Sequence, residues 1–131
     1  MAHPNEQMLR DAYAAFARGD LDGYWSACTD DFAFNVPGAS KVAGRFRGKE
    51  AFMRMIGNVM ALAGGQFEEE VHDVVANDHH GVVLAIHRFP RNGQQREYRT
   101  AHVYEIRDGM LAECWEQPQD PAAFDAAWAP R

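Results

Sequence analysis

The sequence lacks several features on which common classes of protein function depend. It has no apolar run near the roughly 20 residues that a membrane-crossing helix needs. Residues 1–10 lack the basic-then-apolar order of a signal peptide. Basic residues number 13 against 19 acidic ones and lie scattered along the chain. These absences predict a cytoplasmic protein without a membrane segment and without the basic surface that nucleic acid requires.

Patterns typical of disulfides and metal centres are also missing. The two cysteines, Cys28 and Cys114, lack CxxC spacing and are predicted to be free thiols. Six histidines are present, but none forms a motif such as HExxH, and His72, His87 and His102 fall on different predicted strands. We therefore predict no metal site and no cofactor.

The opening part of the chain predicts two helices in a single domain that spans residues 1–131. The first helix has one apolar face, made of Leu9, Ala12, Tyr13 and Phe16. Gly19 ends this helix, and Asp20 can cap a second one with an apolar face made of Leu21, Tyr24, Trp25 and Cys28. Tyr13 therefore faces inward, where its hydroxyl needs a hydrogen-bond partner.

The rest of the chain predicts a third helix followed by a run of strands. Residues 32–36 alternate as a short strand, and residues 52–63 carry one apolar helical stripe. Further strands are predicted at residues 67–76, 82–89, 95–106 and 110–117, and a last helix after Asp120-Pro121. Their short connections require antiparallel pairing, because a parallel crossover needs a dozen or more residues. The periodicity predicts that these residues are mostly buried: Leu9, Phe16, Trp25, Phe32, Phe52, Ile56, Val59, Leu84 and Ile106.

Several segments together resemble the nuclear transport factor 2-like superfamily, and most of all its SnoaL-like polyketide-cyclase and ketosteroid-isomerase-like branches. These segments are GDLDGYWSACTDDF, the Pro-Gly after the first strand, GRFRGKEAF and RDGMLAECW. The resemblance covers nearly the whole chain. It implies a cone-shaped α+β fold, with N-terminal helices packed on a curved, mainly antiparallel sheet, and a homodimer formed through the open sheet face. This scaffold hosts isomerases, dehydratases, cyclases, epoxide hydrolases and non-catalytic proteins, so the fold alone does not define the function.

The resemblance also suggests which residues form a site. In ketosteroid isomerases a tyrosine on the first helix and a protonated aspartate on a late strand form an oxyanion hole, while a second aspartate moves the proton. Tyr13 falls on that tyrosine and His102 on the oxyanion-hole aspartate. Val36, beside Asn35, stands where the family has its second aspartate, and neither moves a proton at neutral pH. In SnoaL-like cyclases an acidic residue on the final strand works with a histidine on the neighbouring strand, and Glu116 and His102 match that pair.

Whether His102 and Glu116 meet depends on the turn at residues 107–109. A three-residue turn with a bulge at Gly109 would put Glu116 diagonally beside His102 on the same face of the sheet. A two-residue turn would turn the last strand over and set His102 opposite Trp115. We favour the bulge, because the resemblance places the pocket-facing positions at Ala112, Cys114 and Glu116.

Two further groups of polar residues are interpreted as structural. A two-residue turn at Asn92-Gly93 would make His87 and Tyr98 cross-strand neighbours, and we expect them to serve in packing. The acidic run at residues 68–70 alternates across a strand, so its outward members are expected to face solvent or a partner.

The sequence thus predicts a pocket for a small apolar molecule. Its predicted catalytic residues are Tyr13, His102 and Glu116, and its predicted ligand-binding residues are Tyr24, Trp25, Met55, Met110 and Cys114. In an apolar cavity, desolvation is expected to raise the pKa of Glu116 toward that of a general base near neutral pH. One hypothesis is a cofactor-free isomerase or cyclase that enolises a carbonyl compound. The alternative is a non-catalytic ligand-binding or dimerisation module.

Overall fold

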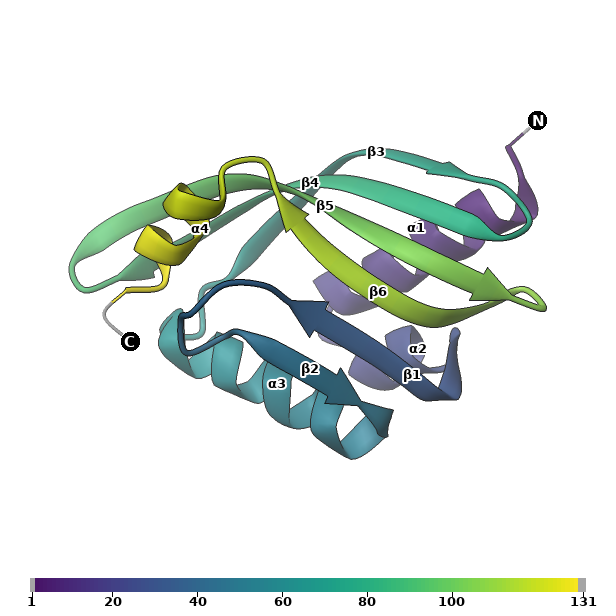
Figure 1. Cartoon of the computed structure of the whole chain (residues 1–131), viewed down its shortest axis with the longest axis horizontal. Coiled ribbons are helices and arrows are strands. Elements are labelled where there is room, and N and C mark those ends of the chain that lie inside the picture. The colour runs from purple at the N-terminus through teal and green to yellow at the C-terminus, as the bar shows by residue number, and fades with distance from the viewer. Residues whose placement is uncertain (1, 130–131) are drawn as a thin grey trace.

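The computed structural model describes residues 2–129, which form helices packed on one six-stranded sheet (Figure 1). The helices are α1 (Pro4–Ala17), α2 (Leu21–Trp25), α3 (Gly48–Leu62) and α4 (Pro121–Ala127). The strands are β1 (Cys28–Val36), β2 (Gly44–Arg47), β3 (Glu68–Ala76), β4 (His80–Arg91), β5 (Gln94–Arg107) and β6 (Met110–Pro118). The order of strands in the sheet is β2-β1-β6-β5-β4-β3. The predicted α+β fold, with helices packed on a curved, mainly antiparallel sheet, is therefore confirmed.

The helices begin where the sequence provides caps. Pro4 lies in the first turn of α1, and the His3 ring accepts a hydrogen bond from a backbone N–H there. Asp20 accepts from the backbone N–H of Gly23 in α2, and Asp120 caps α4 in the same way. Such caps satisfy N–H groups that have no partner inside the helix. Within residues 2–129, no helix is both long and apolar enough to cross a membrane.

The core lies between the helices and the inner, concave face of the sheet. Four residues predicted to be buried are fully buried: Leu9, Phe32, Phe52 and Ile106. The other five are only half-buried: Phe16, Trp25, Ile56, Val59 and Leu84. Leu84 lies on the outer face of β4, since it alternates with the buried Val83 and Ala85.

Two features of the sheet were not predicted. The short edge strand β2 lies between the predicted strand at residues 32–36 and the third helix, where no strand was predicted, and it pairs antiparallel with β1. The expected meander holds for β3 to β6, but β1 joins the sheet beside β6 in parallel. This placement sets Phe34 next to Cys114 and brings β1 to the strand that carries Glu116.

The hairpin between β5 and β6 has a two-residue turn, so the predicted bulge at Gly109 is wrong. Arg107 pairs with Met110, and Asp108 and Gly109 both have a positive φ, 52° and 76°. These angles are typical of a type I′ turn, which Asp-Gly favours because its twist matches that of the flanking strands.

A β-bulge inside β6 reverses the effect of the two-residue turn, which alone would turn Glu116 to the outer face of the sheet. Leu111 pairs with Ile106 and Glu113 pairs with Glu105, so Ala112 is an extra residue without an opposite partner. Beyond the bulge, His102 pairs directly with Glu116 instead of Trp115. His102 and Glu116 therefore share the inner face, and Trp115 lies on the outer face with 36% of its surface exposed.

Candidate functional site

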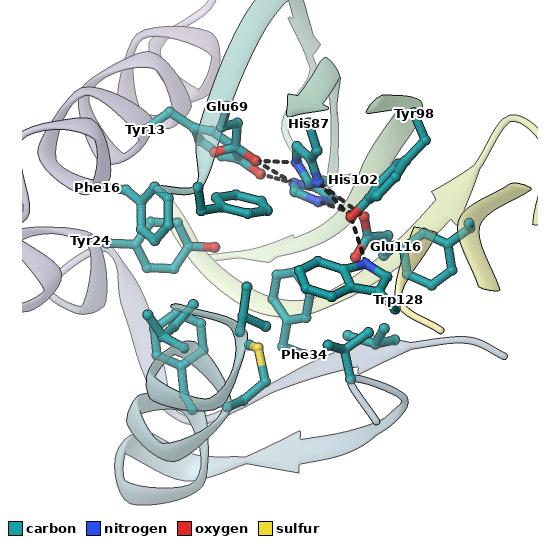
Figure 2. Close-up of a pocket in the computed structure, with 18 residues that line it drawn as sticks. Tyr13, Phe16, Tyr24, Phe34, Glu69, His87, Tyr98, His102, Glu116 and Trp128 are labelled. Carbon is teal, nitrogen blue, oxygen red and sulfur yellow. Dashed lines mark hydrogen bonds and ion pairs between the residues drawn. The ribbon is translucent and has the colours of Figure 1, made fainter. Parts of the chain in front are cut away.

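A mostly apolar cavity lies between the helices and the inner face of the sheet, with its polar groups gathered on one side (Figure 2). It encloses about 70 Å³ of free space. Its apolar wall consists of Phe16, Phe34, Val36, Val42, Phe52, Met55, Ile56, Val59, Phe67, Phe124 and Trp128. Its polar lining consists of Tyr13, Tyr24, Glu69, His87, Tyr98, His102 and Glu116. The cavity thus brings together all three predicted catalytic residues.

A chain of buried hydroxyl groups leads from the second helix to His102. The Tyr24 hydroxyl lies 2.6 Å from that of Tyr104, which lies 2.6 Å from that of Tyr13. The Tyr13 hydroxyl in turn lies 2.5 Å from Nδ1 of His102. Burial, with added repulsion from Tyr24 and Glu69, raises the pKa of Tyr13 well above its ordinary value of 10.0. Tyr13 therefore stays a phenol at neutral pH and can donate a hydrogen bond.

His102 and Glu116 face each other across neighbouring strands. Nε2 of His102 lies 3.6 Å from Oε2 of Glu116, which is longer than a hydrogen bond. This nitrogen is buried and has no hydrogen-bond partner among the described residues. Oε2 of Glu116 accepts a hydrogen bond of 3.1 Å from the Thr100 hydroxyl. His102 and Glu116 thus lie close together without a hydrogen bond between them.

The two groups shift each other's pKa in opposite directions. Burial alone lowers the pKa of His102, but Glu116 and Glu69 outweigh burial, and the pKa is raised above its ordinary value of 6.5. Burial alone raises the pKa of Glu116, but His102, His87 and Thr100 outweigh it, and the pKa is lowered below 4.5. The predicted rise in the pKa of Glu116 is therefore wrong, because desolvation competes with two neighbouring imidazoles. Glu116 is a carboxylate at neutral pH.

A second histidine and a second glutamate border the same cavity. Nε2 of His87 lies 2.6 Å from Oε2 of Glu69, directly opposite on the neighbouring strand. Nδ1 of His87 lies 3.0 Å from the Tyr98 hydroxyl, which accepts a hydrogen bond from Nε1 of Trp128. Two patterns in the sequence indicated this group. The turn at residues 92–93 pairs His87 with Tyr98, and the alternation of the acidic run turns Glu69 inward.

Three of the predicted ligand-binding residues lie outside the cavity lining. Met110 is exposed beside the two-residue turn, at the far end of the hairpin. Cys114 faces inward but is fully buried opposite Tyr104, and burial raises the pKa of its thiol. Trp25 packs on Phe32 and Phe52 instead. Tyr24 and Met55 do line the cavity, as predicted.

The stability of the fold is expected to depend on pH through His102 and Glu116. Because the pKa of His102 is raised on folding, the stability that His102 contributes is complete below pH 6.5. It is lost as pH rises through the pKa of His102 in the folded state. Because the pKa of Glu116 is lowered on folding, the stability that Glu116 contributes is complete above pH 4.5. It is lost as pH falls through the pKa of Glu116 in the folded state. Urea denaturation should therefore show the largest stability difference between wild type and Glu116→Gln between pH 4.5 and 6.5.

The control for this experiment is His72→Gln, which removes an exposed histidine of β3 and should give no such window. The groups that face His102 are Tyr13 from α1, Glu69 from β3, His87 from β4 and Glu116 from β6. Of these groups, only Glu116 differs between wild type and Glu116→Gln. A stability difference that stays constant from about pH 5 to about pH 9 would contradict the ion pair.

Comparison with known proteins places the chain in a family. The sequence profile of the SnoaL-like domain matches residues 9–114. An uncharacterised Mycobacterium tuberculosis protein, Rv0034, is 33% identical over 124 residues, which cover 93% of this chain and 94% of that protein. The structure of Bal32a, from a soil-derived mobile gene cassette, has a TM-score of 0.90 at 26% identity and 98% coverage of both chains. A putative polyketide cyclase from Xanthomonas campestris pv. campestris shares the fold, with a TM-score of 0.72 at 19% identity and coverage of 96% and 97%. The chain therefore belongs to the SnoaL-like domain family.

Proposed function

We propose that this protein catalyses proton transfer on a small, mostly apolar carbonyl compound, as an isomerase or a cyclase does. The substrate lies in the apolar cavity with its oxygen near Tyr13 and His102. Glu116 or His102 removes a proton from the carbon next to the carbonyl group, and donors around the oxygen stabilise the resulting enolate. About 70 Å³ of free space admits only a small molecule unless side chains move.

The observation that carries this proposal is the unpartnered Nε2 of His102. A buried polar atom without a partner costs about 1–3 kcal/mol, so a ligand oxygen that reaches this nitrogen removes the cost. The residue is 4% exposed and borders a cavity whose wall is otherwise largely apolar. The few polar atoms in such a wall determine how a ligand is oriented.

The neighbours of His102 support a role in proton transfer. The Tyr13 hydroxyl is hydrogen-bonded to the other ring nitrogen, Nδ1. Tyr13 is in turn hydrogen-bonded to Tyr104, and Tyr104 to Tyr24, so the imidazole ring has a defined orientation. Glu116 lies 3.6 Å away and favours the protonated ring. The carboxylate and imidazole together provide a base and an acid on the same side of the cavity.

A non-catalytic ligand-binding function is the second candidate, and Val36 is the observation that favours it. The Val36 side chain lines the cavity where ketosteroid isomerases carry their proton-transferring aspartate by resemblance. A pocket without that carboxylate can still bind an apolar molecule through Tyr13 and His102. The two functions differ in whether a bound ketone loses a proton.

The proposed activity is testable as exchange of solvent deuterium into small aryl and β,γ-unsaturated ketones, followed by NMR. We expect EDTA-treated wild-type protein to accelerate exchange at the carbon next to the carbonyl group. His102→Gln should slow this exchange by about 100-fold or more, because a positioned acid or base contributes at least that factor. His72→Gln, which changes an exposed histidine on β3, should exchange at the wild-type rate.

Quenching of tryptophan fluorescence provides the second measurement, because Trp128 lines the cavity. Ketones that quench this fluorescence but show no exchange above the rate in buffer would establish binding without catalysis. That outcome would favour the second candidate function.

We also propose that two copies of the chain meet through the outer face of the sheet. An apolar row crosses four adjacent strands of that face in direct cross-strand register: Val75, Val82, Val103 and Trp115. Val75 is 55% exposed and Trp115 is 36% exposed. None of these four side chains belongs to the buried core, and a two-fold interface would remove the row from water.

Light scattering tests the dimer directly. Wild-type protein at micromolar concentration is expected at twice the chain mass of 14.7 kDa. Val103→Glu places a charge in the middle of the apolar row and should shift the protein to the monomer mass. Asp11→Lys, on the exposed side of α1, should leave the mass unchanged. A single 14.7 kDa species for wild type would rule out the proposed interface.

A further inference from the structure

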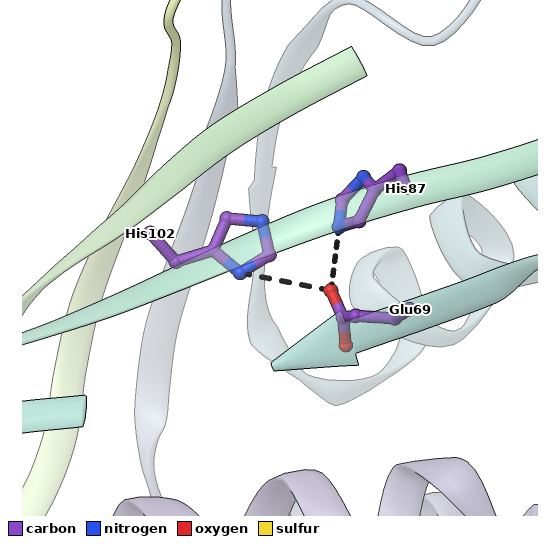
Figure 3. A group of neighbouring side chains, drawn as sticks. All are labelled: Glu69, His87 and His102. Atoms are coloured by element: carbon purple, nitrogen blue, oxygen red, sulfur yellow. Dashed lines mark hydrogen bonds and ion pairs between the residues drawn. The ribbon is translucent and has the colours of Figure 1, made fainter. Parts of the chain in front are cut away.

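Three side chains that commonly bind metal ions converge on the polar side of the cavity (Figure 3). Glu69 from β3, His87 from β4 and His102 from β5 each offer one donor atom, and these atoms lie within 4.8 Å of one another. His87 is 3% exposed, and the Glu69 side chain is 9% exposed. We propose that these three residues bind one divalent first-row transition-metal ion, with Zn²⁺ as the reference ion.

The spacing of the donor atoms suits a single ion. Oε2 of Glu69 lies 2.6 Å from Nε2 of His87 and 4.0 Å from Nδ1 of His102. Two ligands at about 2.1 Å from a tetrahedral zinc ion lie about 3.4 Å apart. The two observed separations bracket that value, and the remaining pair of donor atoms also lies within 4.8 Å. Imidazole nitrogens and a carboxylate oxygen are ordinary ligands of zinc, iron, copper and nickel.

The other nitrogen of each imidazole ring faces an acceptor. Oε2 of Glu116 lies 3.6 Å from Nε2 of His102 and 3.7 Å from Nδ1 of His87. Metal-bound histidines usually donate their second N–H to a carboxylate, a carbonyl or water, which fixes the ring and the tautomer. With the ion on the Glu69 side, the remaining nitrogen of His102 faces Glu116, and that of His87 lies within hydrogen-bond distance of the Tyr98 hydroxyl. Glu116 is then the carboxylate behind His102, and the Tyr98 hydroxyl is the acceptor behind His87.

The charges of the cluster favour a dication. Glu69 and Glu116 are both more than nine-tenths buried, and a buried carboxylate needs compensation by a cation. A divalent ion with two neutral imidazole ligands balances both carboxylates. Three protein ligands leave a fourth position for water or a substrate atom. Such an arrangement is typical of catalytic rather than structural zinc.

Metal binding goes beyond the proposed proton-transfer function and does not rest on it. Nδ1 of His102 can hold either the Tyr13 hydroxyl or the ion, so the ring has different partners in the two states. For this reason, metal binding is measured without any substrate, and ketone exchange is measured on EDTA-treated protein. A failure of ketone exchange leaves the metal titrations unaffected.

The test is a titration of untagged, EDTA-treated protein with Zn²⁺ by calorimetry and with Co²⁺ by absorption spectroscopy. We expect one ion per chain and the strong visible bands of Co²⁺ with about four ligands. His87→Gln and Glu69→Gln should each lower the affinity for Zn²⁺ at least about 10-fold. Glu116→Gln should lower it about 10- to 100-fold, as is usual for a residue that orients a ligand.

His72→Gln and His79→Gln are the matched controls, because they remove exposed histidines of the same sheet region and should keep wild-type affinity. Circular dichroism checks that each variant folds. Histidine-labelled wild-type protein adds a readout that needs no substitution, since Zn²⁺ should shift the ring resonances of His87 and His102. The proposal is overturned if Zn²⁺ does not bind, if folded His87→Gln binds as tightly as wild type, or if Zn²⁺ shifts only the exposed histidines.

Discussion

The pairing of two buried glutamates with two histidines is the interaction on which the rest of the structure depends. Taking a carboxylate out of water costs several kcal/mol unless a partner compensates. Glu69 lies against His87, and Glu116 lies near His102, on the neighbouring strand in each case. A slip of either strand pair by one residue would turn one partner to the outer face and leave the other buried without it. The cluster therefore constrains the register of both β3–β4 and β5–β6.

Two bulges allow this polar cluster and the apolar core to share one face of the sheet. Leu111 and Glu116 are an odd number of positions apart, so in a regular strand they would face opposite sides. The extra residue Ala112 lets both face inward. In β3, Glu69 and the buried Val74 are also an odd number apart, and the register shifts between Val71 and Asp73. In each strand, the inward-facing side chain is apolar on one side of the bulge and is a glutamate of the polar cluster on the other.

Local patterns in the sequence predicted what local forces determine. The helical spacing of Leu9 and Tyr13 and the cap at Asp20 gave the first two helices. The bulge at Ala112 has no local signature, because it follows from burying Leu111 and Glu116 together. The strand β2 has four residues with one apolar side chain, Phe46, so its pairing with β1 has no periodic signal. The meeting of Tyr13, His102 and Glu116 was expected from resemblance, but the predicted turn was the wrong reason for it.

The fold is shared with relatives such as Bal32a, so the chemistry of this protein lies in the side chains of its cavity. The central claim is that the Glu116 carboxylate acts on the His102 imidazole inside that cavity. NMR titration of the histidine rings in EDTA-treated protein tests this claim most directly. We expect a pKa for His102 above its ordinary value of 6.5 in wild type and a lower pKa in Glu116→Gln. A His102 pKa at or below 6.5 in wild type, or the same pKa in both proteins, would contradict it.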